Sequence, residues 1–527
     1  MQEELPKQQG NAEKPGAEKS LARSSLVVSS LTFLSRIMGL LREIVIAALF
    51  GASAEADAFF VAFRIPNFLR RLFAEGAFSQ AFVPVLSEYR QKRSREEVKI
   101  LLDHVAGRLS SILLMVSVVG VIGAPVLATV FAPGYLDESE KFNLLVDMLR
   151  ITFPYILLIS LTGFAGGILN SYNHFAVPAF TPVFLNITLI ICAVWLSPLF
   201  AEPVLAIAWG VIIAGIIQVM FQLPFLGHLH LIPRPRLQPK HEGVAQIITL
   251  MIPIMFSVSV GQINLLLDTV LVTFIAGDGN VSWLYYADRI MYLPLGVFAV
   301  AIATVILPSL SRKHAEASVE HFKATLDWGL RCILLIGMPA SIALVALAQP
   351  LVITIYQRGE FTGESVLPTA QALQAYSLGL IAFMAVKVLA SAYFSRQDTR
   401  TPVRYGIIAM LSNMIMNLLL ILPLAHVGLA LATAFSSWVN AGLLLFGLMK
   451  LNLFSFQRFF WGLCLRLLAA NILMLLFLLQ FADDALAWLA WSNTQRVYEL
   501  AFLCLGGALV YLLGLLLVGL KPCDFYH

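Results

Sequence analysis

Arginines and carboxylates stand inside segments of this chain that are otherwise apolar enough to cross a membrane. Each such charge costs roughly 2.5 to 3.5 kcal/mol at the centre of a membrane-spanning helix, so a large set is expected to line a wet cavity or to bind a charged ligand. Arginines outnumber acids in the set, and internal pairing therefore leaves positive charge for an anion. The residues are Arg36, Arg42, Glu43, Asp57, Arg64, Arg70, Arg71, Glu75, Asp288 and Arg289.

The surplus charge is carried by arginine rather than lysine. A planar guanidinium donates two parallel hydrogen bonds to a phosphate and stays charged at any pH. A diphosphate is therefore the predicted partner. Arg64, Arg71 and Glu75 suit a structural role near a helix end equally well. We expect binding chiefly from four other arginines, Arg36, Arg42, Arg70 and Arg289.

The spacing of the charges indicates a shared helical face. Asp57, Arg64 and Arg71 are seven residues apart, which puts them on one side of a helix. The alternative is that pairs such as Arg36 with Glu43 only fix how the helices pack, or that charges near helix ends reach out to the membrane interface. The excess of arginine favours the binding role.

A second group of polar side chains falls in the C-terminal part of the chain. Carboxylate, amide and hydroxyl oxygens from several helices can hold Na+ or take up a proton. The alternative is a hydrogen-bond network that packs the helices. Lys387, midway along the apolar segment 369–394, either neutralises the acid of this group or extends the cationic cavity. The predicted cation site consists of Asp268, Asn413, Asn417 and Thr433.

The composition identifies the elements that must carry these residues. The chain has 527 residues, is 59% hydrophobic and 13% charged, and has a mean hydropathy of +0.83, which excludes a soluble globular protein. Its apolar segments are long enough to cross about 30 Å of hydrocarbon. They predict an all-α polytopic membrane protein of about fourteen helices, near 26–50, 57–88, 107–132, 148–171, 179–200, 204–227, 245–277, 281–311, 325–356, 369–394, 403–424, 427–449, 459–482 and 498–520.

Signals for enzymatic chemistry are missing from the sequence. It has no phosphate-binding loop, no H-E-x-x-H and no G-x-S-x-G. We therefore expect a transporter rather than an enzyme, with no metal centre, no cofactor and no nucleic-acid partner. The cysteines lack the paired spacing of a disulfide framework or a metal cluster; they are Cys192, Cys332, Cys464, Cys504 and Cys523.

Lysine and arginine are concentrated in alternate loops, and this bias sets the orientation in a membrane. The loops near 90–99, 234–240, 312–323, 396–404 and 450–458 are basic, whereas the opposite loops are mainly acidic. Residues 1–22 mix lysine and glutamate without an apolar core and predict a disordered cytosolic tail. Both termini are therefore expected in the cytoplasm.

Fragments recur at an offset of about 224 residues, the signature of an internal duplication. Leu102-Asp103 matches Leu326-Asp327, and Val177-Pro178 matches Thr401-Pro402. Six helices per copy is an even number, so both copies enter the membrane in the same sense. We expect an N-lobe at 23–243, a C-lobe at 244–450, and two further helices in 451–527.

The run DAFFVAFRIPN at 57–67, continued by LRRLFAEGAFSQAFVP at 69–84, closely resembles the MurJ (MviN) family, the lipid II flippases of bacterial peptidoglycan synthesis. Further matches are SR at 35–36, ITFPY at 151–155, YYADR at 285–289 and FSRQD at 394–398. The resemblance covers nearly the whole chain, from about residue 22 to 520. The long run is highly specific, and the shorter ones are moderately so.

The resemblance implies a fold and a substrate. The fold is that of the multidrug/oligosaccharidyl-lipid/polysaccharide exporter superfamily, with two lobes around a cationic cavity and a groove for the undecaprenyl tail on the last two helices. The substrate is lipid II, an undecaprenyl-diphosphate-linked disaccharide-pentapeptide, in the bacterial inner membrane. The family's transport residues fall here on Ser35, Arg36, Arg42, Asp57, Arg70, Glu75, Arg289 and Lys387.

These inferences predict that lipid II is flipped from the cytoplasmic to the periplasmic leaflet by alternating access. Na+, H+ or the membrane potential remain open as the energy source. We expect a monomer in contact with membrane lipids, and contacts with cell-wall synthesis proteins stay open. The alternatives are a flippase for another polyprenyl-diphosphate glycan, a cation-coupled drug antiporter of the same superfamily, and a scaffold that binds lipid II without moving it.

Overall fold

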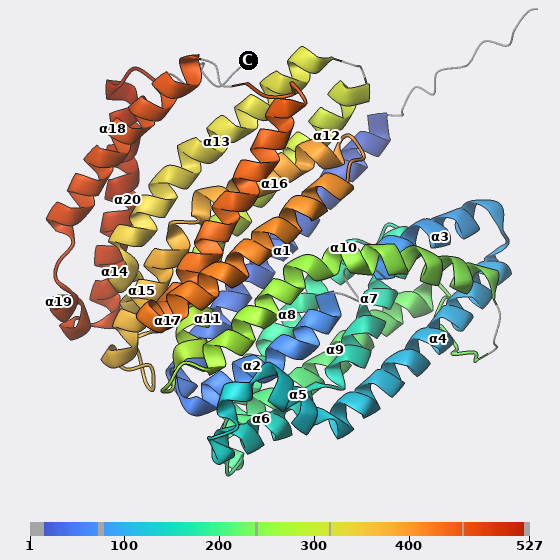
Figure 1. Ribbon diagram of the computed structural model, residues 1–527. Coiled ribbons are helices and arrows are strands. Elements are labelled where there is room, and N and C mark those ends of the chain that lie inside the picture. The colour runs from blue at the N-terminus through green and yellow to red at the C-terminus, as the bar shows by residue number, and fades with distance from the viewer. Residues whose placement is uncertain (1–14, 72–77, 238–240, 316–317, 456–457, 521–527) are drawn as a thin grey trace, which may run out of the picture.

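The computed structural model describes residues 15–71, 78–237, 241–315, 318–455 and 458–520. All regular elements in these ranges are helices, which confirms the all-α prediction (Figure 1). The first helix begins at Pro15, inside the segment predicted as a tail. Residues 15–22 of the predicted tail are therefore helical, and residues 1–14 lie outside the described ranges.

The helices follow one another with short connections. In the first half they are α1 (Pro15–Phe50), α2 (Ala54–Arg70), α3 (Ser79–Lys92), α4 (Arg95–Ile122), α5 (Ala124–Phe131), α6 (Ser139–Thr152), α7 (Tyr155–Ser171), α8 (Ala176–Ile191) and α9 (Leu205–His228). In the second half they are α10 (Glu242–Thr273), α11 (Asn280–Pro294), α12 (Val300–Ala315), α13 (Val319–Ala346), α14 (Ala348–Tyr356), α15 (Val366–Ser377), α16 (Leu380–Phe394), α17 (Arg400–Lys450), α18 (Arg458–Phe481), α19 (Ala485–Ala490) and α20 (Asn493–Leu517).

Within the described residues, ten helical segments are long and apolar enough to cross a membrane. These ten segments do not include α1, the pair α2 and α3, or α10. Counting α1, the consecutive α2 and α3 together, and α10 as one crossing each adds three. The same segments count α17 once, although its 51 residues would span about 76 Å as one straight helix, more than twice the hydrocarbon thickness. Two crossings in α17 bring the total to the fourteen that the sequence predicts.

The middle of α17 is a sharp reversal. Ala425 has φ 47° and ψ −130°, outside the helical region, two residues after Pro423. Asn413 Nδ2 lies 3.3 Å from Thr433 Oγ1, although a straight helix would separate residues twenty apart by about 30 Å. The two halves of α17 therefore fold back on each other, at the boundary predicted between segments 403–424 and 427–449.

Helix starts recur at the offset seen in the sequence. Val319 opens α13 224 residues after Arg95 opens α4, and Arg400 opens α17 224 residues after Ala176 opens α8. Similarly, α14 follows α13 as α5 follows α4. The recurrence supports a duplicated unit. The lobe boundaries at 243 and 450 stay predictions.

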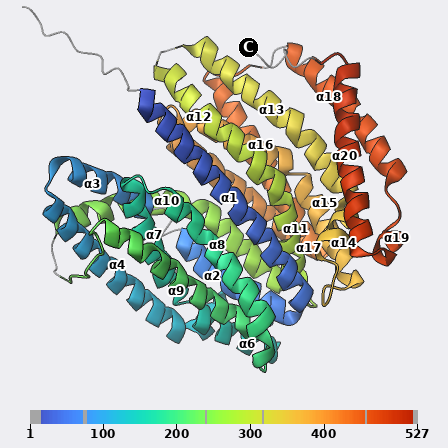
Figure 2. The same ribbon diagram turned by 180° about the vertical axis from the view of Figure 1, so that it is seen from behind.

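Two groups of helices meet along α1 and α10. Figures 1 and 2 show α3 to α9 on one side and α12 to α20 on the other. In sequence α1 opens the first group and α10 the second, and each packs along helices of both: α1 contacts α8 and α14, and α10 contacts α17 and α3. Residues on α1 and α10 are thus placed between the groups.

The last two long helices form a hairpin on the outer side of the second group. Helices α18 and α20 pack on each other and on α13, while large apolar side chains such as Trp461 and Leu505 face outward with 61% and 73% of their surface exposed. Arg496 fastens the hairpin because its buried guanidinium donates to the carbonyl oxygens of Trp488, Leu489 and Gln357 at 2.8 to 3.1 Å.

Candidate functional site

Arg42 and Glu43 on α1 meet Tyr285 and Arg289 on α11 in one buried polar cluster. Arg42 forms an ion pair with the adjacent Glu43. The Tyr285 hydroxyl donates to Glu43 Oε1 at 2.8 Å, and Arg289 Nε lies 3.6 Å from the same oxygen. Arg289 also donates to the Tyr285 hydroxyl at 3.3 Å. One carboxylate therefore serves two guanidiniums, and the cluster keeps a net positive charge.

The pairing differs from the alternative raised by the sequence, which paired Arg36 with Glu43. Glu43 is instead the partner of Arg42 and Arg289. Arg42 is 8% exposed, whereas the Arg289 side chain is 33% exposed. Arg42 is thus enclosed in the cluster, whereas part of the Arg289 side chain is accessible.

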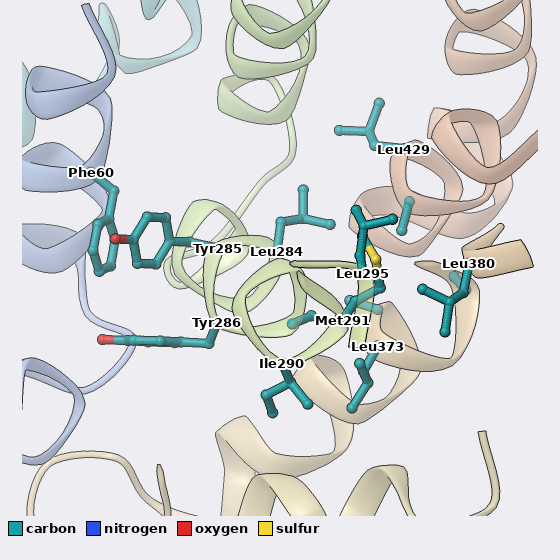
Figure 3. Close-up of a cluster of buried hydrophobic side chains, with 14 of the residues drawn as sticks. Phe60, Leu284, Tyr285, Tyr286, Ile290, Met291, Leu295, Leu373, Leu380 and Leu429 are labelled. Carbon is teal, nitrogen blue, oxygen red and sulfur yellow. The ribbon is translucent and has the colours of Figure 1, made fainter. Parts of the chain in front are cut away.

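Aromatic packing fixes α11 against α2. The rings of Phe60 and Tyr285 stack with their centroids 3.9 Å apart, and the Tyr286 ring meets Phe60 edge-on at 5.5 Å (Figure 3). The Tyr286 hydroxyl donates to the carbonyl oxygen of Gly51 at 2.9 Å. Offset and edge-on rings are favourable arrangements, and they hold Arg289 one turn further along α11.

Asp57 on α2 binds the N-terminus of α11. Its carboxylate accepts from the backbone N–H groups of Gly279 and Ser282 at 2.9 and 2.8 Å, and from the Ser282 hydroxyl at 2.6 Å. A carboxylate is favoured there because the first N–H groups of a helix lack partners and its dipole is positive. Asp57 is 1% exposed. In this conformation it joins two helices and has no surface for a substrate.

Lys141 on α6 completes this end of the molecule. Its ammonium lies 2.7 Å from Asp278 and 3.7 Å from Asp57, and 4.3 Å from the centre of the Tyr135 ring. Burial and the charge of Asp57 raise the pKa of the Tyr135 hydroxyl, so it stays neutral. From the sequence Lys141 is only a loop charge, and its place at this end of the molecule was missed because Asp57 and Asp278 are distant from it in sequence.

Arg36 is exposed on α1 and forms no ion pair with any described residue. Its guanidinium lies against the backbone of Gly296, where a Cβ atom would overlap it. The neighbouring Ser35 carbonyl accepts from Asn186 of α8 at 3.1 Å. Ser35 therefore anchors α1 through its backbone, while Arg36 keeps its charge available.

Arg70 stands at the end of α2, apart from the cluster on α1. Its Nε and Nη2 donate to Asn67 Oδ1 at 2.9 and 2.7 Å, and it lines a cavity between α7, α8 and α9. Arg64, further back on α2, donates to Thr269 of α10 at 2.7 Å, which fits its predicted structural role. Glu75 lies outside the described residues.

The four residues of the predicted cation site come together between α10 and the two halves of α17. Asn417 donates to Asp268 Oδ1 at 2.7 Å and to Asn413 Oδ1 at 2.8 Å, and Thr433 Oγ1 lies 3.5 Å from Asp268 Oδ2. Among the described residues no three His, Cys, Asp or Glu side chains gather at a metal-like site. Lys387 is exposed on α16 and forms no ion pair with Asp268 in the described part of the chain.

Comparison with known proteins identifies relatives along most of the chain. The family model described as "Lipid II flippase MurJ" matches residues 46–499. The "Probable lipid II flippase MurJ" of Vibrio cholerae is 46% identical over 513 residues, 96% of this chain and 98% of that protein. The "Lipid II flippase MurJ" of Burkholderia cenocepacia is 42% identical over 82% of this chain and 85% of its own length.

Solved structures agree with these relatives. "Lipid II flippase MurJ, inward closed conformation" superposes with a TM-score of 0.78 at 30% identity, over 93% of this chain and 98% of that one. An inward-facing multidrug resistance MATE transporter of the MOP superfamily gives 0.67 at 16% identity, over 81% of this chain and 98% of its own. The second likeness concerns the fold alone.

Proposed function

The chain belongs to the MurJ family of lipid II flippases, and from that premise we propose that it holds the substrate's diphosphate between the guanidiniums of Arg42 and Arg289. It is a multi-pass membrane protein and a lipid II flippase, hence a transporter rather than an enzyme. The observation that carries the proposal is Glu43, one buried carboxylate shared by two arginines. The surplus charge draws an anion, which competes with Glu43 for both guanidiniums.

The two guanidiniums belong to different halves of the duplicated chain. Arg42 is on α1 and Arg289 on α11, so a diphosphate bound to both bridges the halves. Arg36, six residues before Arg42, adds a third donor from α1. The headgroup thereby becomes part of the contact between the lobes. Because that contact changes when the lobes move, the ligand binds the two conformations with different affinities.

We propose an orientation with both termini in the cytoplasm of a bacterial inner membrane. The basic loops after α3 and before α10 then face inward. The end closed by Asp57, Lys141 and Asp278 faces the periplasm. In this conformation the molecule is shut on the periplasmic side, and lipid II enters laterally from the inner leaflet with its tail in the bilayer beside α18 and α20.

Transport then requires the Asp57 end to open. The lobes rock, Asp57 leaves the N-terminus of α11, and Lys141 separates from Asp278, so that the headgroup reaches the outer side. We propose that Na+ or H+ at Asp268, or the membrane potential, resets the empty carrier. The potential contributes about 2.3 kcal/mol for each elementary charge moved through 100 mV, which is ample for a cavity with surplus arginines.

The charge of the site opposes one of two rival substrates and is compatible with the other. A drug antiporter for cationic compounds needs an acidic cavity, which the arginine surplus opposes. Another polyprenyl-diphosphate glycan would satisfy the arginines equally well, and here family membership favours lipid II. We propose a monomer as the working unit, with contacts to cell-wall synthesis proteins outside the transport path.

The test is a leaflet-specific assay of lipid II in cells depleted of the protein and complemented with variants. Arg42→Ala and Arg289→Ala should each reduce outward delivery at least tenfold, the effect of about 1.4 kcal/mol. Arg150→Ala is the matched control, because Arg150 is an exposed arginine whose ion-pair partner among the described residues is the exposed Asp147. Full delivery by both cavity variants at wild-type expression would refute the diphosphate site.

A further inference from the structure

A cavity with a mixed lining of polar and apolar groups lies within the first group of helices, beside the arginine site. Its volume is about 420 Å³, within the range of pockets that hold small organic ligands. Helices α7, α8 and α9 form its walls, and Arg70 reaches its rim from α2. The polar lining side chains include Arg70, Asn170, Thr181, Asn186, Gln218 and Gln222.

Gln222 lines this cavity and carries a buried acceptor. The side chain is 1% exposed, and its Oε1 has no hydrogen-bond donor among the described residues. Its Nε2 donates to Thr181 Oγ1 at 2.9 Å, and that hydroxyl in turn donates to the carbonyl oxygen of Val177. The amide is therefore held in one orientation. A buried acceptor without a donor costs about 1 to 3 kcal/mol, so a ligand that donates to it gains that amount.

The chemistry of the lining selects an uncharged polar ligand. Gln218 lies beside Gln222, with Nε2 3.3 Å from the Thr181 carbonyl. The remaining walls combine hydroxyls, amides and glycines with two prolines and the apolar side chains of Ile159 and Leu185. An apolar chain would leave these groups unpaired. Beside Gln222 an anion would meet the side-chain carbonyl oxygen and be repelled, whereas the guanidinium of Arg70 in the same lining suits the neighbouring diphosphate. Groups with O–H and N–H donors, such as sugar hydroxyls and amides, pair with them.

The cavity adjoins the arginine site through Asn186. This residue lines the cavity and donates to the carbonyl oxygen of Ser35, the residue before Arg36. We propose that the cavity is a subsite for the hydroxyl- and amide-bearing part of the headgroup whose diphosphate the arginines hold. The inference rests on the proposed function and adds to it the place where the sugar-peptide portion binds.

The experiment compares two ligands on the purified full-length protein in detergent. Lipid II carries the sugar-peptide portion, whereas undecaprenyl diphosphate carries only the tail and the diphosphate. Gln222→Met keeps the shape and removes the acceptor, and it should weaken lipid II binding about tenfold with undecaprenyl diphosphate binding unchanged. Gln371→Met, at an exposed glutamine on α15, is the matched control.

A second variant removes space instead of a hydrogen bond. A Cβ at Gly166 would lie 3.4 Å from Pro178 Cβ and 3.8 Å from Gln222 Oε1, so Gly166→Ala fits without a clash and blocks the approach to the acceptor. Alanine is also preferred to glycine inside a helix by roughly 0.5 to 1 kcal/mol, so the variant should fold. It is expected to show the same selective loss of lipid II.

The outcomes separate this inference from the proposed function. Unchanged lipid II binding in both Gln222→Met and Gly166→Ala would mean that the cavity holds only water and would overturn the subsite. An equal loss of both ligands would overturn it as well, since the sugar-peptide portion would then make no difference. If Arg42→Ala and Arg289→Ala leave both ligands bound, the diphosphate site is wrong, whatever the result at Gln222.

Discussion

At the scale of single residues, Glu43 sets how much positive charge α1 and α11 present. It accepts hydrogen bonds or ion pairs from Arg42, Tyr285 and Arg289, so it both stabilises the free protein and competes with an anionic ligand. This balance suits a carrier, because a site that bound the diphosphate without competition would release it slowly. In the proposed mechanism the carboxylate occupies the guanidiniums until the diphosphate displaces it.

Glu43→Gln should therefore lower the thermal stability of the free protein and increase its response to an anion. Removing one partner from a buried ion pair costs about 3 to 5 kcal/mol, and here two guanidiniums lose their counter-charge. Added pyrophosphate should raise the melting temperature of the variant more than that of the wild type. Glu140→Gln, at an exposed glutamate of α6, serves as the control. A variant that melts like the wild type with and without pyrophosphate would contradict the shared-carboxylate reading.

The types of the site residues were predictable, but their pairing was not. An excess of arginine inside apolar segments indicates an anion site because of its desolvation cost. The partner of Arg289 depends on how α1 lies against α11. Glu43 and Tyr285, which bring the two helices together here, are 242 residues apart. A contact over that distance cannot be predicted from the local spacing of residues. Likewise Gln218 and Gln222 look like ordinary helix residues until α7 and α8 leave a cavity beside them.

At the scale of elements, the ends of helices carry much of the functional geometry. Asp57 holds the start of α11, Arg496 holds α19 and the start of α20, and His241 caps α10 by accepting from the Gly243 N–H at 3.2 Å. Helix positions were readable from apolar runs and from the 224-residue repeat, because both follow from local hydrophobicity. The contacts at the helix ends could not be predicted in this way, since two of the three use partners distant in sequence.

Arg496→Met should loosen the C-terminal hairpin without unfolding the rest. The buried guanidinium satisfies three carbonyl oxygens, and a methionine fills the space but donates nothing. Losing hydrogen bonds from a charged donor should cost about 2 to 4 kcal/mol at the junction of α19, α20 and the end of α14. Hydrogen exchange should rise in the first turns of α20 and at Gln357, while α7 to α9 stay protected. A uniform rise in hydrogen exchange along the chain would argue against a local stabilising role for Arg496.

The cap on α10 should respond to pH. Burial, and then the charge of nearby His104, lowers the pKa of His241 below its usual 6.5. The native state therefore resists protonation, so the contribution of this cap is present above about pH 6.5 and is lost as the pH falls towards the lowered native pKa. Protonated His241 cannot accept from Gly243. Protection factors in the first turn of α10 should fall between pH 7.5 and 5, and His241→Asn, a good N-cap, should remove the dependence. A dependence that survives in the asparagine variant would assign it to another group.

At the scale of the whole molecule, the two helix groups are joined tightly at one end. Asp57 to α11, Lys141 to Asp278, and the Glu360 N–H to the Ala48 carbonyl at 2.9 Å all lie near helix ends that connect α1, α2 and α6 with α10, α11 and α14. A few polar contacts over a small area can hold this end closed and still be broken, because each polar group can bond to water instead when the end opens. Their sum sets the balance between the closed and open states.

Asp57→Asn should shift that balance towards the open state. The carboxylate charge attracts Lys141 and strengthens the hydrogen bonds from Gly279 and Ser282, and the asparagine amide lacks that charge. The closed state should therefore lose about 2 kcal/mol of stability, which shifts the equilibrium roughly 30-fold towards the open state. Spin labels at the exposed Glu140 and Glu360 should report a longer and broader distance distribution in the variant. Asp147→Asn, at an exposed aspartate of α6, should leave it unchanged. If Asp57→Asn keeps the wild-type distribution, the end is held shut by apolar packing such as Phe60 on Tyr285 rather than by the capped helix, and the transport cycle must break that packing first.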